Sequence, residues 1–268
     1  MKAKDLKEAV KSKYEGIVLQ NTEDKGACCC GSTGCCEGID YSVFSDDYTN
    51  QKGYNPEADL GLGCGIPTDF AGIKEGATVL DLGSGAGNDV FVARSLVGES
   101  GKVTGLDFTE AMVKKARENL KKTGYSNIEF VLGDIESMPL DENTYDVVIS
   151  NCVLNLVPDK NKAFREIFRV LKPGGHFCIS DVVLMGNLPE KLREEVELYA
   201  GCVSGALPRE EYLSVIEAQG FQGITVHKEK QIAVPDELIE QYLEEWEISE
   251  YRSGLKGIFS ITVSGRKG

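Results

Sequence analysis

The sequence predicts an α/β protein built on a doubly wound, mostly parallel sheet. From residue 76 onward, apolar runs of strand length alternate with amphipathic helical patterns. A glycine-rich turn follows the first of these runs and opens a helix. The chain has 268 residues, of which 41% are hydrophobic and 27% charged, an ordinary globular composition. Strands that alternate with helices are typical of a parallel sheet with helices on both faces.

The central elements follow one another in a regular order. Five apolar runs have the length of strands: 77–83, 102–107, 127–134, 145–151 and 174–183. Helical patterns lie between them at 84–98, 109–124 and 160–175. In the second of these patterns we expect Thr109 to be the N-cap and Gly124 to end the helix.

The two ends of the chain are less regular. Residues 1–20 form a charged amphipathic pattern that predicts a helix. Beyond Asp181 we expect two helices within 188–221, an acidic helix at 236–247, and late strands at 223–230 and 257–267. The sequence therefore divides into an N-terminal helix with a cysteine-rich cap, a core, and a C-terminal part with lid helices and final strands: 1–65, 66–185 and 186–268.

Composition excludes several classes of partner. The net charge of −14 and the pI near 4.7 disfavour nucleic acid, whose phosphates need clustered Lys and Arg, and an anionic membrane surface. The charged first residues do not resemble a signal peptide, and no run approaches the length of about 20 apolar residues that spans a bilayer. We expect a cytoplasmic protein, in which the nine cysteines are mostly reduced.

A glycine-rich loop, Asp81-Leu-Gly83-Ser-Gly85-Ala-Gly87, follows the first expected strand. The second strand ends at Asp107, where a carboxylate can accept hydrogen bonds from ribose hydroxyls. A phosphate-binding loop of the Walker type is absent, and Asp81 would repel a pyrophosphate. S-adenosylmethionine fits this loop better, because it carries an ammonium group and a sulfonium but no phosphate.

At this point the chain resembles the class I S-adenosylmethionine-dependent methyltransferases, through VLDLGSGAGND, GLDFTEAMV, GDIESMPL, YDVVISN and RVLKPGGHF in that order. The resemblance covers about residues 60–185 and implies a Rossmann-like, seven-stranded methyltransferase sheet. It also implies a set of cofactor-binding residues. The expected set is Asp81, Gly83, Ser84, Gly85 and Gly87 at the methionine part, Asp107 at the ribose, Met112, Asp134 and Ile135 at the adenine, and Asn151 at the closing end of the site.

Three cysteines come from separate places that this fold could bring together. Cys152 directly follows the fourth strand, Cys202 lies in the region after the fifth strand, and Cys64 lies just before the core. Cys178, in contrast, is expected to be a small buried core residue. His176 and His227 fall within expected strands and are given structural roles.

The acceptor suggested by these thiols is trivalent arsenic. No catalytic base stands out in the sequence, and three-coordinate As(III) already presents a lone pair that can attack a sulfonium methyl group. Thiolates are the ligands that soft, thiophilic ions prefer. A small organic acceptor, with incidental cysteines, and a thiol-rich metalloid or zinc buffer without transfer activity are the two alternatives.

The chain also closely resembles the arsenite methyltransferases, through YTNQKGYNPEADLGLGCGIP, SNCVLNLVPDK and YAGCVSGAL. This resemblance extends over nearly the whole chain. It implies that Cys64, Cys152 and Cys202 bind As(III), that Tyr48 lies near the cofactor, and that methyl groups are added stepwise in arsenic detoxification. It further implies a thiol reductant, such as thioredoxin or glutathione, as co-substrate.

Five more cysteines lie close together near the N-terminus: Cys28, Cys29, Cys30, Cys35 and Cys36. A structural zinc site is disfavoured, because adjacent cysteines fit poorly into paired tetrahedral ligand units. Our hypothesis is that this segment captures arsenic or other soft metals, passes them inward, and forms transient disulfides with the site cysteines. A tail with exposed thiols and little catalytic role is the alternative.

Overall fold

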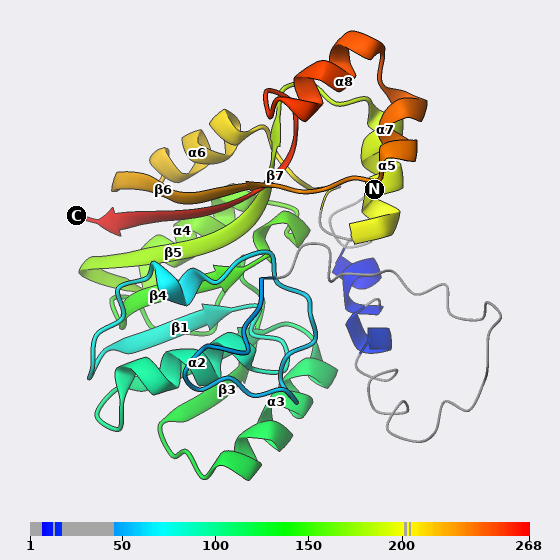
Figure 1. The fold of residues 1–268 in the computed structure, drawn as a ribbon. Coiled ribbons are helices and arrows are strands. Elements are labelled where there is room, and N and C mark those ends of the chain that lie inside the picture. The colour runs from blue at the N-terminus through cyan, green and yellow to red at the C-terminus, as the bar shows by residue number, and fades with distance from the viewer. Residues whose placement is uncertain (1–6, 13, 18–45, 201–202, 204) are drawn as a thin grey trace, which may run out of the picture.

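A computed structural model describes residues 7–12, 14–17, 46–200, 203 and 205–268 (Figure 1). Seven strands form its centre: β1 Thr78–Leu82, β2 Lys102–Asp107, β3 Ile128–Leu132, β4 Tyr145–Asn151, β5 Leu171–Met185, β6 Phe221–Gln231 and β7 Gly257–Lys267. They make one sheet with the order β3-β2-β1-β4-β5-β7-β6. The pairs among β1 to β5 are parallel, and β7 runs antiparallel to both β5 and β6. The α/β, seven-stranded sheet expected from the sequence is confirmed.

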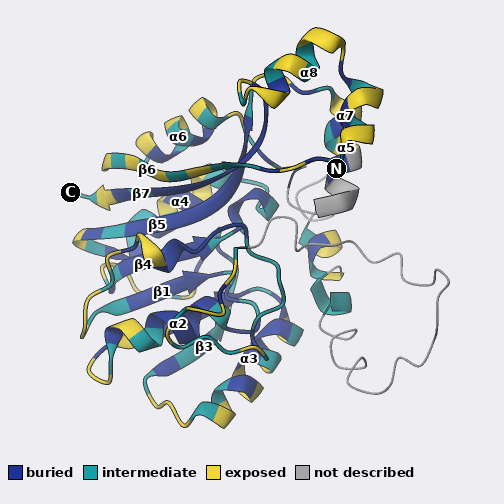
Figure 2. Ribbon diagram, in the orientation of Figure 1, coloured by how far each residue is buried: buried dark blue, intermediate teal, exposed yellow. Residues whose placement is uncertain are grey.

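Helices cover both faces of this sheet (Figure 1). Their bounds are α2 Asn88–Val97, α3 Glu110–Thr123, α4 Lys160–Val170, α5 Glu190–Ala200, α6 Arg209–Glu217, α7 Asp236–Tyr242 and α8 Glu245–Arg252. α2 and α3 pack on one face, and α4 and α6 pack on the other. Figure 2 shows the strands as the buried layer, with exposed residues on the outer sides of the helices. A sheet buried on both faces explains why the parallel strands are apolar throughout.

A third apolar cluster lies beyond the carboxyl end of β5, under α5, α7 and α8. Its buried members include Cys64, Cys152, Val182, Leu184, Leu188, Leu192, Val196, Val203, Ala206, Ile232, Val234, Ile239, Leu243, Tyr251 and Ile258. We call this group the lid cluster. It is separate from the two clusters that flank the sheet, and it places two cysteines in apolar surroundings.

The ends of α3 agree with the sequence. Thr109 is the N-cap, although its side chain makes no capping bond; its N–H instead donates to Asp107 Oδ1 at 2.8 Å. Gly124 follows the helix in the left-handed conformation, at φ 72°. Glycine is favoured at this position because it has no Cβ to clash there.

Some element boundaries differ from the expected ones. The helix expected at 236–247 is two helices, because the chain is extended at Leu243 and a capping box between Glu244 and Glu247 starts α8. α4 ends at Val170 and β5 begins with the next residue. Within the expected helix at 1–20, the described residues 7–12 and 14–17 are helical.

Cys178 and the two histidines have structural roles. Cys178 is fully buried in β5, where burial raises the pKa of its thiol to about 12. His176 Nε2 contacts the carbonyl of Ala71, and His227 Nε2 contacts Ser264 Oγ. The expectation for Cys178 is confirmed, and both histidines lie within strands as expected.

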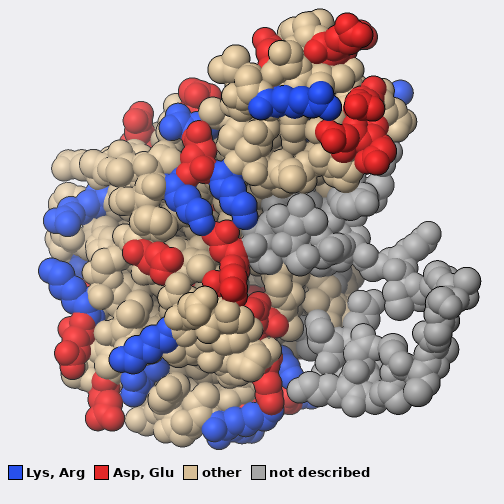
Figure 3. All heavy atoms as spheres, viewed as in Figure 1, with Lys and Arg blue, Asp and Glu red and all other residues tan. Residues whose placement is uncertain are grey.

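The surface carries both signs of charge. On the face shown in Figure 3, Lys and Arg side chains are dispersed among Asp and Glu. Within the described part of the chain, no helix is both long and apolar enough to cross a membrane. The first observation agrees with the composition, which disfavours nucleic acid.

A carboxyl group lies at the centre of the molecule, on β5. Asp181 is fully buried, and it accepts hydrogen bonds from Tyr212 Oη at 3.1 Å and from the N–H of Val182 at 3.0 Å. Burial raises its pKa to about 7, against the opposing effect of the Lys160 ammonium. The folded state therefore holds this proton at pH values where the unfolded chain has lost it.

We expect Asp181→Asn to stabilise the protein increasingly, relative to the wild type, as the pH rises. The unfolded carboxyl ionises near its ordinary pKa of about 4, so the wild type loses stability from there up to about pH 7 and levels off above it. The variant lacks this loss. Thermal melts of both proteins across that pH range measure the difference, which should grow between those limits.

Asp146→Asn is the matched control. Although burial acts against it, hydrogen bonds from Lys172 and Thr78 lower the pKa of Asp146. The stability that Asp146 contributes is present above its unfolded pKa and is lost as the pH falls. Its variant should therefore be less stable than the wild type at neutral pH and approach it in acid, and the same pH trend in both variants would contradict the assignment.

Candidate functional site

A cavity of about 360 Å³ lies at the carboxyl ends of β1, β2 and β4. In an open parallel sheet this edge is where ligands bind. The cavity is lined by most of the expected cofactor residues, namely Tyr48, Asp81, Gly83, Ser84, Gly85, Asp107, Met112, Ile135 and Asn151. Cys152, an expected arsenic ligand, lines it as well. Further lining residues come from the segment before β1, including Ala58 to Gly63.

The glycine loop forms one wall of this cavity. Gly83 and Gly85 have φ values of 67° and 51°, which side chains rarely adopt. A Cβ on Gly83 would lie 2.4 Å from Val153, whereas a Cβ on Gly85 would have only the Met112 sulfur within 4 Å, at 4.0 Å. The loop therefore approaches its neighbours closely at Gly83 and leaves open space over Gly85.

Gly87 is not among the lining residues. It is the N-cap of α2, with φ 102°, and a Cβ there would lie 2.9 Å from the ring of Phe130. Its position in the structure serves the turn into α2 and the packing beneath it. A direct contact of Gly87 with the cofactor stays a prediction.

Two buried carboxyl groups with raised pKa values line the cavity. Asp81 is 3% exposed; burial raises its pKa well above the ordinary value, and the nearby charges of Asp89 and Asp107 raise it further. Asp107 accepts hydrogen bonds from the N–H groups of Gly85, at 3.0 Å, and Thr109, but burial still raises its pKa. Such carboxyl groups are stabilised in their ionised form by a ligand that brings positive charge or hydroxyl donors.

Unpartnered polar atoms mark the same wall. Ser84 Oγ and Asn88 Oδ1 are buried, line the cavity, and have no hydrogen-bond partner among the described residues. Buried polar atoms are rarely left unsatisfied, so each points to a missing ligand contact. The residues present therefore fit a ligand with both cationic and hydrogen-bonding groups, as S-adenosylmethionine has.

The far end of the cavity is closed by the N-terminal helical residues. Tyr14 lines the cavity, and Lys7 Nζ lies 2.5 Å from Asp134 Oδ2 and also pairs with Glu136. Asp134 also accepts a hydrogen bond from the N–H of Glu136 and is not among the lining residues. Ile135 does line the cavity, and a contact of Asp134 with the adenine stays a prediction.

Cys64 and Cys152 come together in the lid cluster. They are 1% and 3% exposed, and Cys152 also lines the cavity. Cys152 has φ 60°, in the left-handed region that non-glycine residues rarely occupy, and its N–H donates to the carbonyl of Ser180 at 2.8 Å. Strained backbone of this kind occurs preferentially at functional sites.

Cys202 lies outside the described residues, as do the five N-terminal cysteines. Of the described residues near it in the sequence, Val196 and Val203 both belong to the lid cluster. Gly205 packs so closely that a Cβ there would lie 1.9 Å from the carbonyl oxygen of Asn155. Among the described residues, no three Cys, His, Asp or Glu side chains form a group that could hold a metal ion.

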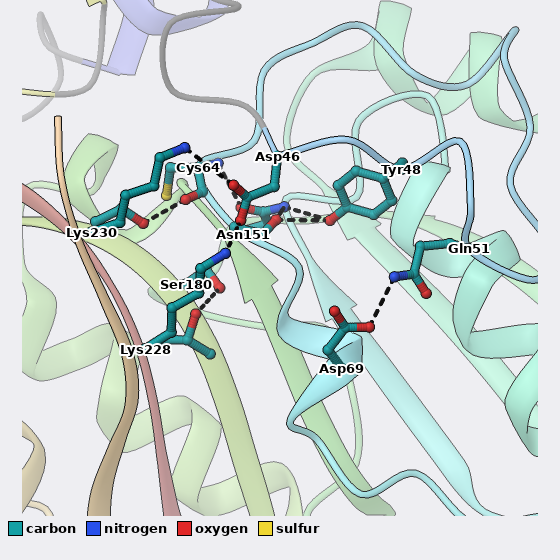
Figure 4. A network of polar contacts seen from close by, with 12 residues as sticks. Asp46, Tyr48, Gln51, Cys64, Asp69, Asn151, Ser180, Lys228 and Lys230 are labelled. Atoms are coloured by element: carbon teal, nitrogen blue, oxygen red, sulfur yellow. Dashed lines mark hydrogen bonds and ion pairs between the residues drawn. The ribbon is translucent and has the colours of Figure 1, made fainter. Parts of the chain in front are cut away.

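A buried polar network joins the segment that contains Cys64 to α2. Asn151 Nδ2 donates to Tyr48 Oη at 2.8 Å (Figure 4). Tyr48 Oη donates to Asp89 Oδ1 at 2.8 Å, and Asn151 Nδ2 also donates to Asp89 Oδ2 at 3.2 Å. Burial raises the pKa of Asp89 to about 6, although these two donors oppose the shift. Sequence analysis did not identify Asp89; the signal was an acidic residue directly after the glycine loop, in Gly87-Asn-Asp89.

Comparisons with known proteins agree on one chemistry. Residues 73–230 match the family described as Methyltransferase domain. The chain is 37% identical to an arsenite methyltransferase of Halobacterium salinarum, over 98% of this chain and 67% of that protein. It is 34% identical to an arsenite methyltransferase of Aquipseudomonas alcaligenes, over 86% of this chain and 66% of that protein.

A solved structure gives the same result. The crystal structure of an arsenic(III) S-adenosylmethionine methyltransferase from Chlamydomonas reinhardtii matches with a TM-score of 0.64 and 37% identity. The match covers 75% of this chain and 66% of that one. The chain thus spans about two thirds of the length of each of these relatives.

We expect S-adenosylmethionine to bind more tightly as the pH rises from about 4 toward neutrality. Asp81 and Asp107 have raised pKa values in the free protein, so at low pH part of the binding energy is spent on releasing their protons. Titration calorimetry at several pH values measures this. Adenosine, which carries no positive charge, is the matched ligand; an equally steep pH dependence for adenosine would contradict the role of Asp81.

Asp107→Ala is expected to weaken the binding of S-adenosylmethionine by about 1.5–3 kcal/mol, the usual cost of a lost hydrogen bond to a charged group. The same calorimetric titration gives this value. Asp146→Ala changes an acidic residue at the start of β4, remote from the cavity, and serves as control. Equal binding by Asp107→Ala and the wild type would contradict the assignment of the ribose-binding carboxylate.

Proposed function

The chain belongs to the S-adenosylmethionine-dependent arsenite methyltransferases, and we propose that it methylates trivalent arsenic held by the thiolates of Cys64, Cys152 and Cys202. The observation that carries this proposal is the convergence of Cys64 and Cys152 in one buried cluster beside the cavity. These two residues are far apart in the sequence, and Cys152 lines the cavity directly. The packing of Val203 into the same cluster supports the third ligand.

The cofactor contributes an activated methyl group on a sulfonium sulfur. We assign Asp81, Ser84 and Gly85 to its amino-acid part and Asp107 to its ribose. Met112 and Ile135 line the part of the cavity that is left for the adenine. This assignment is supported by the buried Asp81 carboxyl group, whose pKa is raised, and by the unpartnered Ser84 Oγ.

Thiolate ligands explain how arsenic is activated without a general base. As(III) bound to three sulfurs is pyramidal, and its lone pair points away from them. Because that lone pair needs no deprotonation, the protein's main contributions are to position the arsenic and to exclude water. The apolar lid cluster around Cys64 and Cys152 supports water exclusion.

After each methyl transfer, arsenic must be returned from the pentavalent to the trivalent state. When the arsenic lone pair attacks the methyl carbon, the As–C bond forms as the bond between that carbon and the sulfonium sulfur breaks. S-adenosylhomocysteine leaves with the bonding electron pair, and arsenic becomes formally pentavalent. Two thiolate sulfurs then leave as a disulfide and return two electrons to arsenic, which becomes trivalent again. A dithiol or glutathione class reductant reduces this disulfide, and we propose thioredoxin or glutathione in that role.

The remaining assignments follow from the same proposal. We propose a cytoplasmic enzyme, because reduced thiols are needed at the site and cytosolic thiols are kept reduced. We retain 1–65 as a cap, 66–185 as the cofactor-binding core, and 186–268 as the lid and final strands. The N-terminal cysteines, which lie outside the described residues, are proposed to deliver arsenic and to exchange disulfides with the site.

Cys152→Ser is expected to abolish or severely reduce arsenite methylation while leaving the affinity for S-adenosylmethionine nearly unchanged. Serine is a hard oxygen ligand and binds As(III) weakly, but it is almost isosteric with cysteine. The assay is transfer of a labelled methyl group to arsenite with excess dithiol, together with calorimetry of the cofactor. Cys178→Ser, in the core of the sheet, is the matched cysteine control and should retain arsenite binding.

The same assay separates the alternatives. Label that appears only on organic acceptors would indicate a different substrate class. Tight binding of arsenite without any transfer would indicate a metalloid buffer. Loss of cofactor binding in Cys152→Ser would assign that residue a packing role instead.

A further inference from the structure

The backbone of Cys64 is held by side chains. Within the described stretch 46–66 there is no helix or strand. The Cys64 N–H donates to Asn151 Oδ1 at 2.9 Å, and its carbonyl oxygen accepts a hydrogen bond from Ser260 Oγ. Asn151 Nδ2 also donates to the carbonyl of Gly65 at 2.8 Å. The Asn151 carboxamide therefore contacts the chain on both sides of the Cys64 Cα atom.

Asn151 is itself fixed from the other side. Its amide donates to the Tyr48 hydroxyl and to Asp89, and the Tyr48 hydroxyl donates to Asp89 and lies 3.0 Å from the carbonyl of Gly65. Tyr48 and Asp89 are 4% and 8% exposed, so little water competes for these bonds. Figure 4 shows Tyr48, Asn151 and Cys64 in this arrangement.

Asp89 belongs to the cofactor side of the molecule. It is the second residue of α2, which begins directly after the glycine loop. Asp89 lines the cavity, but its two oxygens accept hydrogen bonds from Tyr48 and Asn151. Asp81 also lines the cavity, and among the described residues no side chain donates a hydrogen bond to its carboxyl group. Asp89 therefore holds other side chains at the cavity wall, and Asp81 is left to meet the ligand.

We propose that Asp89, Tyr48 and Asn151 are positioning residues that fix the position of Cys64 relative to the glycine loop. The proposal rests on the function proposed above, in which Cys64 is an arsenic ligand. The network joins the segment of Cys64 to the end of β4 and to the start of α2, the two elements that frame the methyl donor. Displacement of a reacting centre by about 1 Å costs on the order of 100-fold in rate.

A second contact holds the same segment at its other end. Asp46 pairs with Lys228 and with Lys230 of β6, the latter at 3.2 Å. The segment from Asp46 to Cys64 is therefore anchored on β6 at its start and on Asn151 at its end (Figure 4). Between these anchors, Tyr48 is the residue whose hydroxyl reaches the network.

The test uses Asp89→Asn in the full-length enzyme. The asparagine amide keeps one acceptor for Tyr48 but turns an NH₂ group toward the NH₂ group of Asn151, which breaks that contact. We expect the KM for arsenite to rise and kcat to fall by about tenfold each, the effect of losing a buried charged hydrogen bond. The KM for S-adenosylmethionine should change by less than about threefold, the scale of ordinary surface substitutions.

Tyr48→Phe is the second variant, because it removes only the hydroxyl and keeps the ring in its apolar cluster with Ile66 and Val92. It should show the same split between the two substrates. Asp69→Asn is the matched control: it makes the same Asp-to-Asn change in the short helix Pro67–Asp69, where exposed Asp69 accepts a hydrogen bond from Gln51 and not from Tyr48 or Asn151. It should behave like the wild type.

Three outcomes would overturn the proposal. Unchanged constants in Asp89→Asn and Tyr48→Phe would show that the network does not set Cys64. An equal rise in both KM values would assign Asp89 to the cofactor, and an effect of Asp69→Asn as large as that of Asp89→Asn would show a general charge effect. Wild-type activity on arsenite in the same assay keeps these outcomes separate from a failure of the proposed function.

Discussion

The site depends first on the parallel register of β1 with its two neighbours. Leu82 is level with Leu106 on β2 and with Ser150 on β4. The glycine loop after β1 and the last residues of β2 and β4, Asp107 and Asn151, therefore lie at one edge of the sheet. A slip of one residue would turn every side chain of the strand to the other face and separate these groups. The apolar layers on both sides of the sheet fix this register, so the clusters that provide stability also determine the geometry of the site.

The same edge carries an excess of buried negative charge. Asp81, Asp89 and Asp107 lie near one another, and burial raises the pKa of each. Such an arrangement destabilises the free protein, since the unfolded carboxyl groups ionise without this cost. This excess of buried negative charge is explained by the different roles of the carboxyl groups. The Asp89 carboxyl accepts hydrogen bonds from Tyr48 and Asn151, whereas burial and neighbouring negative charge act on Asp81 without such donors. On the proposed function, the cationic cofactor would offset this cost at Asp81.

Much of this could be predicted from the sequence, because the sheet and its glycine loop are local patterns. The strand runs, the ends of α3 and most of the lining residues depend on neighbours in the chain. What could not be predicted depends on long-range contacts. The contact of Asn151 with the Cys64 backbone joins residues 87 apart in sequence. The hydrogen bond from Tyr48 to Asp89 likewise forms only in the folded chain. Similarly, Gly87 belongs to a loop whose sequence is typical of ligand binding, but its packing against the Phe130 ring is a long-range contact that the loop sequence does not show.

Asn151 of the polar network and Cys152 of the lid cluster are consecutive residues. The backbone at Cys152 explains how their side chains come to lie in different surroundings. In an extended strand, neighbouring side chains point to opposite faces of the same sheet. At the end of β4, however, Cys152 has φ 60° while its N–H still pairs with Ser180. Asn151 consequently faces the polar network around Tyr48 and Asp89, and Cys152 faces the apolar lid cluster. The strained residue places a thiol in apolar surroundings directly beside a polar group that holds Cys64. Glycine or asparagine would adopt this conformation at lower cost, so the presence of cysteine is explained by its sulfur rather than by its backbone.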